Sequence, residues 1–146
     1  MRAVLQRVLC AEVEVDGEIV GRIERGILAY ISIDKGDSSE DAGFIADKLV
    51  NLRIFEDQSG KMNLSVTDVG GGILLVSNFT LHGNCGKGRR PGFDAAAGPA
   101  LAQGLYEKVI KMVAEKGVTV ERGIFGAHMK VHSVNDGPVT FILDSK

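Results

Sequence analysis

Apolar and polar residues alternate along residues 2–15, which is the pattern of a β-strand with one buried face. Asp16-Gly17 follows, a dipeptide that favours the tight turn of a hairpin, and residues 18–24 are predicted to be the returning strand. Residues 27–33 are apolar almost without interruption, which indicates a buried strand. We expect these three stretches to form an antiparallel meander.

Two later segments carry apolar residues at helical spacing. Ser38 precedes the first and approximates a capping box with Asp41, so a helix is predicted to begin there. The second helix is predicted to begin near Pro99, a favoured first-turn residue, and to end with Gly117 as its C-cap. The residues expected on the two buried stripes are Ala42, Ile45, Leu49 and Leu52 in the first helix, and Leu101, Leu105, Val109, Met112 and Val113 in the second.

The remaining chain consists of short predicted strands and one long loop. The strands are predicted at residues 53–56, 73–79, 118–122, 129–135 and 138–144. Residues 82–98 are rich in glycine, proline and arginine, and are predicted to form the loop. We therefore predict one domain over residues 1–146, of the α+β class, with a mostly antiparallel, barrel-like β core and two main helices.

The composition fits an ordinary soluble domain, with 146 residues, 45% hydrophobic and 25% charged. The formal net charge of −2 provides no global basic field for nucleic acid, although a local patch could still bind it. Cys10 and Cys85 form no disulfide framework, which favours a reduced, cytoplasmic setting. The start of the chain lacks the apolar stretch of a signal peptide, and no apolar run is long enough for a membrane span.

Metal and nucleotide sites are weakly indicated. His128 and His132 are four residues apart, but in the predicted strand this spacing corresponds to ~13 Å, too far to bind one zinc ion. Residues 83–88 lack the spacing of a phosphate-binding P-loop. We therefore predict no metal and no cofactor.

The long loop contains a cluster of three basic residues, Lys87, Arg89 and Arg90. Such a cluster can hold phosphate oxygens without reading bases. A charged loop in contact with solvent alone explains it equally well.

Two sites have polar groups beside apolar strands. Ser77 and Thr80 lie at the end of the predicted strand 73–79, where a hydroxyl could enter a cleft, yet no adjacent base or nucleophile elbow is evident. Thr80 is explained as well by an ordinary strand position. Gly137-Pro138 is either a simple turn between two strands or a fixed kink that points carbonyl groups into a pocket.

Together these segments resemble the D-aminoacyl-tRNA deacylase family. The two motifs are Ser77-Asn78-Phe79-Thr80-Leu81 and Asn135-Asp136-Gly137-Pro138-Val139-Thr140, with further likeness at residues 1–8, 87–91 and 123–129. The resemblance covers essentially the whole chain, and both motifs in this order are highly specific. It implies a proofreading hydrolase that cleaves the ester bond of D-aminoacyl-tRNA and binds the 3′ end of the tRNA.

The resemblance also implies a homodimer with active sites at the subunit interface. Gly137 and Pro138, joined by a cis peptide bond, would project from one subunit into the active site of the other. There they would exclude an L side chain. Arg7 would brace this loop, and Met129 would lie close to it. Glycine has no side chain to exclude, so glycyl-tRNA, including glycine mischarged on alanine tRNA, would also be cleaved.

In the same family, Ser77, Asn78, Phe79 and Thr80 would line the pocket for the aminoacyl group. The backbone N–H groups of Phe79 and Thr80 would face the ester carbonyl, with help from the 2′-OH of the terminal ribose. Lys87, Arg89 and Arg90 would contact tRNA phosphates. Asn78 stands where the family has Gln, one methylene longer, which puts the efficiency of catalysis in question more than its stereochemistry.

Two other functions remain open at this point. The basic loop would also suit a tRNA-binding module without catalysis, which predicts salt-sensitive binding and no turnover. Thr80 could alternatively be the nucleophile of a small-ester hydrolase, which predicts that Thr80→Ala abolishes turnover.

Overall fold

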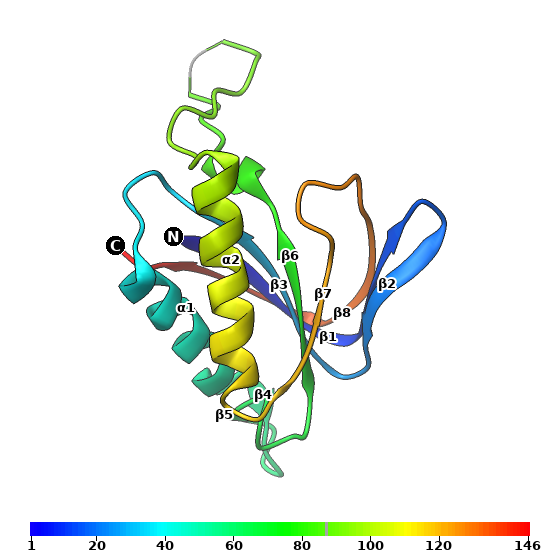
Figure 1. The fold of residues 1–146 in the computed structure, drawn as a ribbon. Helices are drawn as coiled ribbons and strands as arrows, with labels where there is room; N and C mark the ends of the chain where they lie inside the picture. Colours follow the sequence, from blue (N-terminus) through cyan, green and yellow to red (C-terminus); the bar gives the residue numbers. More distant parts are fainter. Residues whose placement is uncertain (87) are drawn as a thin grey trace.

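The computed structural model describes residues 1–86 and 88–146. Two helices lie side by side against one face of a strongly curved sheet (Figure 1). The elements are β1 (Arg2–Val15), β2 (Glu18–Ile23), β3 (Gly26–Ser32), α1 (Ser39–Asn51), β4 (Phe55–Glu56), β5 (Met62–Leu64), β6 (Gly72–Ser77), the 3₁₀ helix η1 (Phe79–His82), α2 (Pro99–Ala114), β7 (Thr119–Arg122) and β8 (Lys130–Asp144). The predicted α+β class with two main helices is confirmed.

Strand β1 is the centre of the sheet. β8 pairs antiparallel along one of its edges, from Arg2 opposite Asp144 to Glu14 opposite Lys130. The other edge is divided, because β3 pairs with residues 2–8 and β2 pairs with residues 11–15. The predicted meander, with the returning strand in the middle, is therefore wrong. At 14 residues β1 is long enough to pair with both shorter strands in succession.

The second half of the sheet is parallel. β3 pairs in parallel with β6, and β6 pairs in parallel with β7, so the sheet is mixed, although most of its pairs are antiparallel. β7 then comes close to β2: a Cβ atom on Gly21 would lie 2.6 Å from the carbonyl oxygen of Arg122. Glycine is needed at this approach, which nearly closes the sheet into the expected barrel-like form.

The helices cover the core as their apolar spacing predicts. Ser38 is the N-cap of α1 and forms the predicted capping box with Asp41. Most of the predicted stripes are buried, but Leu101 is 43% exposed. Tyr106, which was not predicted, is buried in α2 and donates its hydroxyl hydrogen bond to the carbonyl of Leu75 at 2.7 Å. The buried stripe of α2 therefore keeps Leu105, Val109 and Val113 as predicted, loses Leu101 and gains Tyr106.

The end of α2 also differs from its prediction. The helix ends at Ala114 with Glu115 as the C-cap, and Gly117 follows in the left-handed region, at φ +79°. The N–H groups of Lys116 and Gly117 donate to carbonyls three residues back, so the last turn tightens before the chain leaves it. Gly117 thus terminates this tight turn rather than the helix itself.

Two predicted strand boundaries are wrong near the candidate site residues. The strand predicted at 73–79 ends at Ser77, and η1 follows. The strands predicted at 129–135 and 138–144 are one strand, β8, with a bulge: Asn135 is opposite Val8 and Thr140 is opposite Gln6, so residues 136–139 face Arg7 alone. The Gly137-Pro138 peptide bond within this bulge is cis.

The short strand predicted at residues 53–56 is only Phe55–Glu56, and it pairs with β5, which the sequence did not indicate. Across the described residues, no helix is long and apolar enough to cross a membrane.

Candidate active site

A cleft of about 780 Å³ opens where β3 and β6 end. These strands are parallel, so their carboxyl ends meet at one edge of the sheet, a common position for ligand sites in α/β proteins. The start of α2 and the segment 125–129 complete the walls. Five predicted site residues line the cleft: Ser77, Asn78, Phe79, Thr80 and Met129. Residues 77–80 and Met129, far apart in the sequence, thus lie around one cleft, whereas the resemblance implied that Met129 lies close to the Gly137-Pro138 loop.

Asn78 connects the strand to the turn in the cleft wall. Its N–H donates to the carbonyl of Ile31 at 2.8 Å, which extends the pairing of β6 with β3 by one residue. Asn78 is also the N-cap of η1, and its Oδ1 accepts hydrogen bonds from the Thr80 N–H at 3.3 Å and the Thr80 hydroxyl at 2.6 Å. The side chain of Asn78 therefore folds back on its own turn.

This arrangement distinguishes the two N–H groups that were predicted as donors. The Thr80 N–H is engaged by Asn78, whereas the Phe79 N–H has no hydrogen-bond partner among the described residues. The hydroxyl of Thr80 donates to an amide oxygen, which is too weak a base to activate a nucleophile. The geometry therefore favours backbone chemistry over attack by Thr80.

Ser32 and His82 form a polar pair behind the same turn. Ser32 ends β3, is 1% exposed, and its Oγ lies 2.5 Å from His82 Nδ1 and 3.4 Å from the carbonyl oxygen of Phe79. Burial lowers the pKa of His82, partly offset by the nearby carboxylates of Asp34 and Asp37. The sequence analysis missed this pair; its only signal was a serine near the end of the apolar run 27–33.

Phe79 and Phe93 mark the mouth of the cleft. The Phe79 side chain is 57% exposed, and its ring meets that of Phe93 edge-on, with 5.0 Å between centroids. Phe93 belongs to the predicted long loop, which extends past the first turn of α2 in Figure 1. Arg89 and Arg90 are exposed in this loop. Lys87, the third predicted phosphate contact, lies outside the described residues.

Arg7, Gly137 and Pro138 are absent from the lining of this cleft and lie together at the bulge of β8. Arg7 is 4% exposed; its Nη1 donates to the carbonyl of Ile54 at 2.8 Å, and its Nε lies 2.9 Å from Asp136 Oδ2, a contact of opposite charges without hydrogen-bond alignment. Asn135 Nδ2 donates to the carbonyls of Arg7 and Val139, both at 3.0 Å. The contacts of Arg7 and Asn135 thus hold the backbone around Gly137-Pro138, which does not line the cleft of its own chain.

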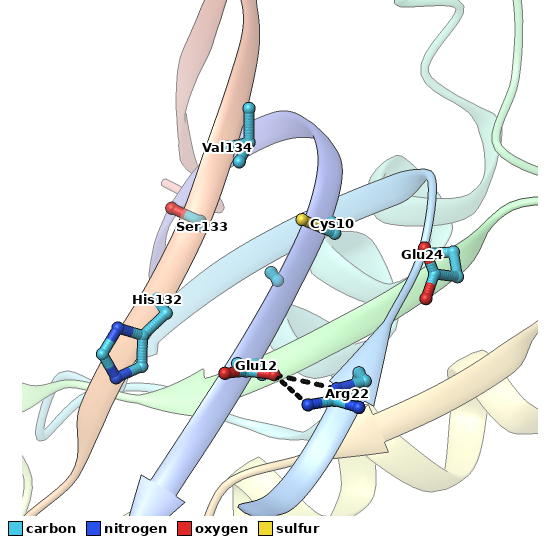
Figure 2. A pocket seen from close by; sticks show the side chains of 8 residues that line it. Cys10, Glu12, Arg22, Glu24, His132, Ser133 and Val134 are labelled. Atoms are coloured by element: carbon cyan, nitrogen blue, oxygen red, sulfur yellow. Dashed lines mark hydrogen bonds and ion pairs between the residues drawn. The ribbon is translucent and has the colours of Figure 1, made fainter.

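A second, shallower hollow of about 390 Å³ lies between β1, β2 and β8 (Figure 2). Glu12 Oε2 accepts hydrogen bonds from Arg22 there, and His132 lies opposite Glu12 on the paired strand β8. None of the predicted site residues lines it. In the part of the chain that the structure describes, no group of three histidine, cysteine or acidic side chains is arranged to bind a metal.

Comparison with known proteins places these features in a family. A family model described as D-Tyr-tRNA(Tyr) deacylase matches residues 4–144. A curated relative from Geobacter metallireducens, named D-aminoacyl-tRNA deacylase, is 59% identical over 145 residues, which make up 99% of this chain and 96% of the relative.

Two solved structures have the same fold as this chain. One titled "c-Myc DNA Unwinding Element Binding Protein" matches with a TM-score of 0.93 at 41% identity, over 100% of this chain and 99% of that one. Another, a probable eukaryotic D-amino acid tRNA deacylase by its title, has a TM-score of 0.86 at 20% identity over 97% of each chain, a likeness of fold. By sequence and fold, this chain belongs to the D-Tyr-tRNA(Tyr) deacylase family.

Proposed function

We propose that the protein hydrolyses the ester bond between a D-amino acid and the 3′ end of tRNA, as its family membership indicates. The observation that carries the mechanism is the Phe79 N–H, a backbone donor with no partner among the described residues, in a turn that lines the cleft. An aminoacyl ester is already activated, so a donor aimed at the developing oxyanion provides substantial help, about 3 kcal/mol by analogy with known oxyanion holes.

The chemistry then needs little from side chains. The substrate carbonyl accepts a hydrogen bond from Phe79 N–H, and Thr80 N–H adds a second when the substrate displaces Asn78 Oδ1 from its 3.3 Å contact. Water attacks the carbonyl carbon, the 2′-OH of the terminal ribose assists, and the 3′ oxygen leaves with a proton. Ser77 and Met129 shape the pocket around the aminoacyl group.

Discrimination against L substrates comes from a second copy of the chain. Its Gly137-Pro138 segment enters the cleft and occupies the space of an L side chain, while a D side chain points away. A dimer is supported by the exposed apolar side chains of β1 and β8, which are Leu9, Val134, Phe141 and Ile142. Glycyl-tRNA passes the same gate because it has no side chain.

The tRNA is held outside the cleft by the long loop, where Arg89 and Arg90, and with them Lys87, contact phosphates. The net charge of −2 means that this affinity is local to the loop. The substrate is aminoacyl-tRNA in the cytoplasm, where the protein acts.

The direct test is deacylation of D-tyrosyl-, L-tyrosyl- and glycyl-tRNA in the presence of EDTA. We expect rapid loss of the D-tyrosyl and glycyl esters and survival of the L-tyrosyl ester. Turnover of all three esters would contradict the gate. Salt-dependent tRNA binding with no turnover of any ester would instead identify a binding module without catalysis.

A further inference from the structure

Three of the four residues of η1 contact residues of the neighbouring strands β1 and β3. The carbonyl of Phe79 and the side chain of His82 meet the Ser32 hydroxyl, and the carbonyl of Leu81 accepts from Arg2 Nη1 at 3.3 Å. A 3₁₀ turn of four residues has few hydrogen bonds of its own. Its orientation at the cleft therefore depends on these outside contacts.

The contact to Phe79 matters because of peptide geometry. The Phe79 carbonyl and the Thr80 N–H belong to one planar trans peptide group and point in opposite directions. Ser32 lies 3.4 Å from the oxygen of this group, and Asn78 Oδ1 lies 3.3 Å from its nitrogen. The group is thus held at both ends, which fixes the direction in which its N–H points.

Only one arrangement of protons satisfies both contacts of Ser32. A serine hydroxyl has one proton, so when it donates to the Phe79 carbonyl it must accept from His82 Nδ1–H. His82 therefore determines where the Ser32 proton points. Ser32 is among the residues that line the cleft, but its hydroxyl contacts the Phe79 carbonyl, at the opposite end of the peptide group from the Thr80 N–H.

We propose that Ser32 and His82 are positioning residues for ester hydrolysis, which orient the Phe79–Thr80 peptide so that its one donor, the Thr80 N–H, can meet the developing oxyanion beside the Phe79 N–H. This inference rests on the proposed function, and it adds two residues separated by 50 positions to the machinery of the cleft. Because they act through the backbone, their loss weakens transition-state binding more than ground-state binding of tRNA.

The experiment measures kcat and KM for D-tyrosyl-tRNA, with thermal melting, for Ser32→Ala, His82→Leu and His82→Asn. Asparagine carries an amide on Cγ, as histidine carries Nδ1, and can still bond to Ser32, whereas leucine fills the space without polar atoms. Ser59→Ala, which removes an exposed serine hydroxyl in a distant turn, is the matched control.

We expect Ser32→Ala and His82→Leu to lower kcat by ~10–100-fold, somewhat less than loss of a complete oxyanion donor. KM should stay within about two-fold, and His82→Asn should recover most of kcat. Folded variants with wild-type kcat, or equal losses in His82→Asn and His82→Leu, would overturn the inference alone. A wild-type protein that cleaves no ester would overturn the proposed function as well.

Discussion

Nε of Arg7 lies 2.9 Å from Oδ2 of Asp136, at the point where one residue of β1 faces four residues of β8. The Arg7 side chain is buried, while that of Asp136 is 36% exposed. The guanidinium group also holds the carbonyl of Ile54 and lies 3.6 Å from Glu56. A single side chain thus connects the bulge to the segment that follows α1.

Replacing Arg7 with Met should therefore destabilise the protein. The aliphatic volume is kept, but the carbonyl of Ile54 loses its buried donor, which costs about 1–3 kcal/mol. Asp136 can turn toward water, so loss of its ion pair adds little. Urea denaturation measures the change, and Arg22→Met, which removes an exposed ion pair with Glu12, should cost less than about 1 kcal/mol. Equal effects of both variants would contradict the bracing role of Arg7.

Gly137→Ala should disturb the same bulge. Gly137 has φ +121°, and a Cβ there would lie 2.7 Å from Val139 Cγ2 and 3.2 Å from Arg7 Nη2. We expect a loss of about 1–3 kcal/mol in unfolding free energy and faster cleavage of L-tyrosyl-tRNA relative to the D ester. Gly60→Ala is the control, because its φ is +73° but nothing lies within 4 Å. Unchanged selectivity in a folded Gly137→Ala protein would argue against the gate.

Thr80→Val separates backbone catalysis from attack by a hydroxyl. The hydroxyl donates to Asn78 Oδ1 and has no base beside it, so we expect kcat to fall by less than ~10-fold. A nucleophile, by contrast, would lose several orders of magnitude. Single-turnover deacylation of D-tyrosyl-tRNA measures the effect, and a loss of ~10³-fold or more would restore Thr80 as the nucleophile.

His82 should give the protein a pH-dependent stability. Burial lowers the pKa of His82, and the N-terminal ammonium group and Arg2 lower it further, whereas the carboxylates of Asp34 and Asp37 oppose these effects. The unfolded chain therefore binds this proton more readily, so stability is fully present above the unfolded pKa of about 6.5 and is lost as pH falls through the lower folded pKa. Unfolding free energies between pH 8 and 5 should slope less in His82→Asn than in the wild type. Identical slopes would contradict the assignment.

The exposed arginines of the loop should control tRNA affinity without affecting the chemistry. Arg89→Gln combined with Arg90→Gln should weaken tRNA binding and reduce the salt slope of log K by about 1.4–1.8, because each lost phosphate contact removes about 0.7–0.9. The single-turnover rate constant of deacylation at saturating enzyme should not change. Lys61→Gln, an exposed charge in the turn before β5, provides the control. A salt slope equal to that of the wild type would remove the loop from the tRNA interface.

Local signals predicted the local structure well. Ser38 and Asp41 mark the start of α1 because a capping box involves residues three apart, and the apolar spacing of both helices follows from one turn of backbone. The likeness of residues 77–81 to a known motif selected a segment that lines the cleft, whereas Gly137 and Pro138, from the second motif, lie outside the lining of the cleft of the same chain.

Long-range pairing was not predictable in the same way. No local pattern shows that β1 pairs with both β2 and β3, or that Gly137-Pro138 is a bulge within one strand rather than a turn between two. Phe79, an apolar residue two positions beyond Ser77, hides the end of β6 in the sequence. Ser32 and His82 come together only when β3 and β6 have paired, so neither residue stood out in the sequence.

The pairing of β1 with β8 has a consequence for biosynthesis. One edge of β1 pairs along its length with residues 130–144, which lie more than 100 residues later in the sequence. Until residues 130–144 are synthesised and leave the exit tunnel, β1 has one unpaired edge, which is open to other strands. The sheet, and with it the bulge that carries Gly137, can therefore be completed only after residues 130–144 have emerged from the ribosome.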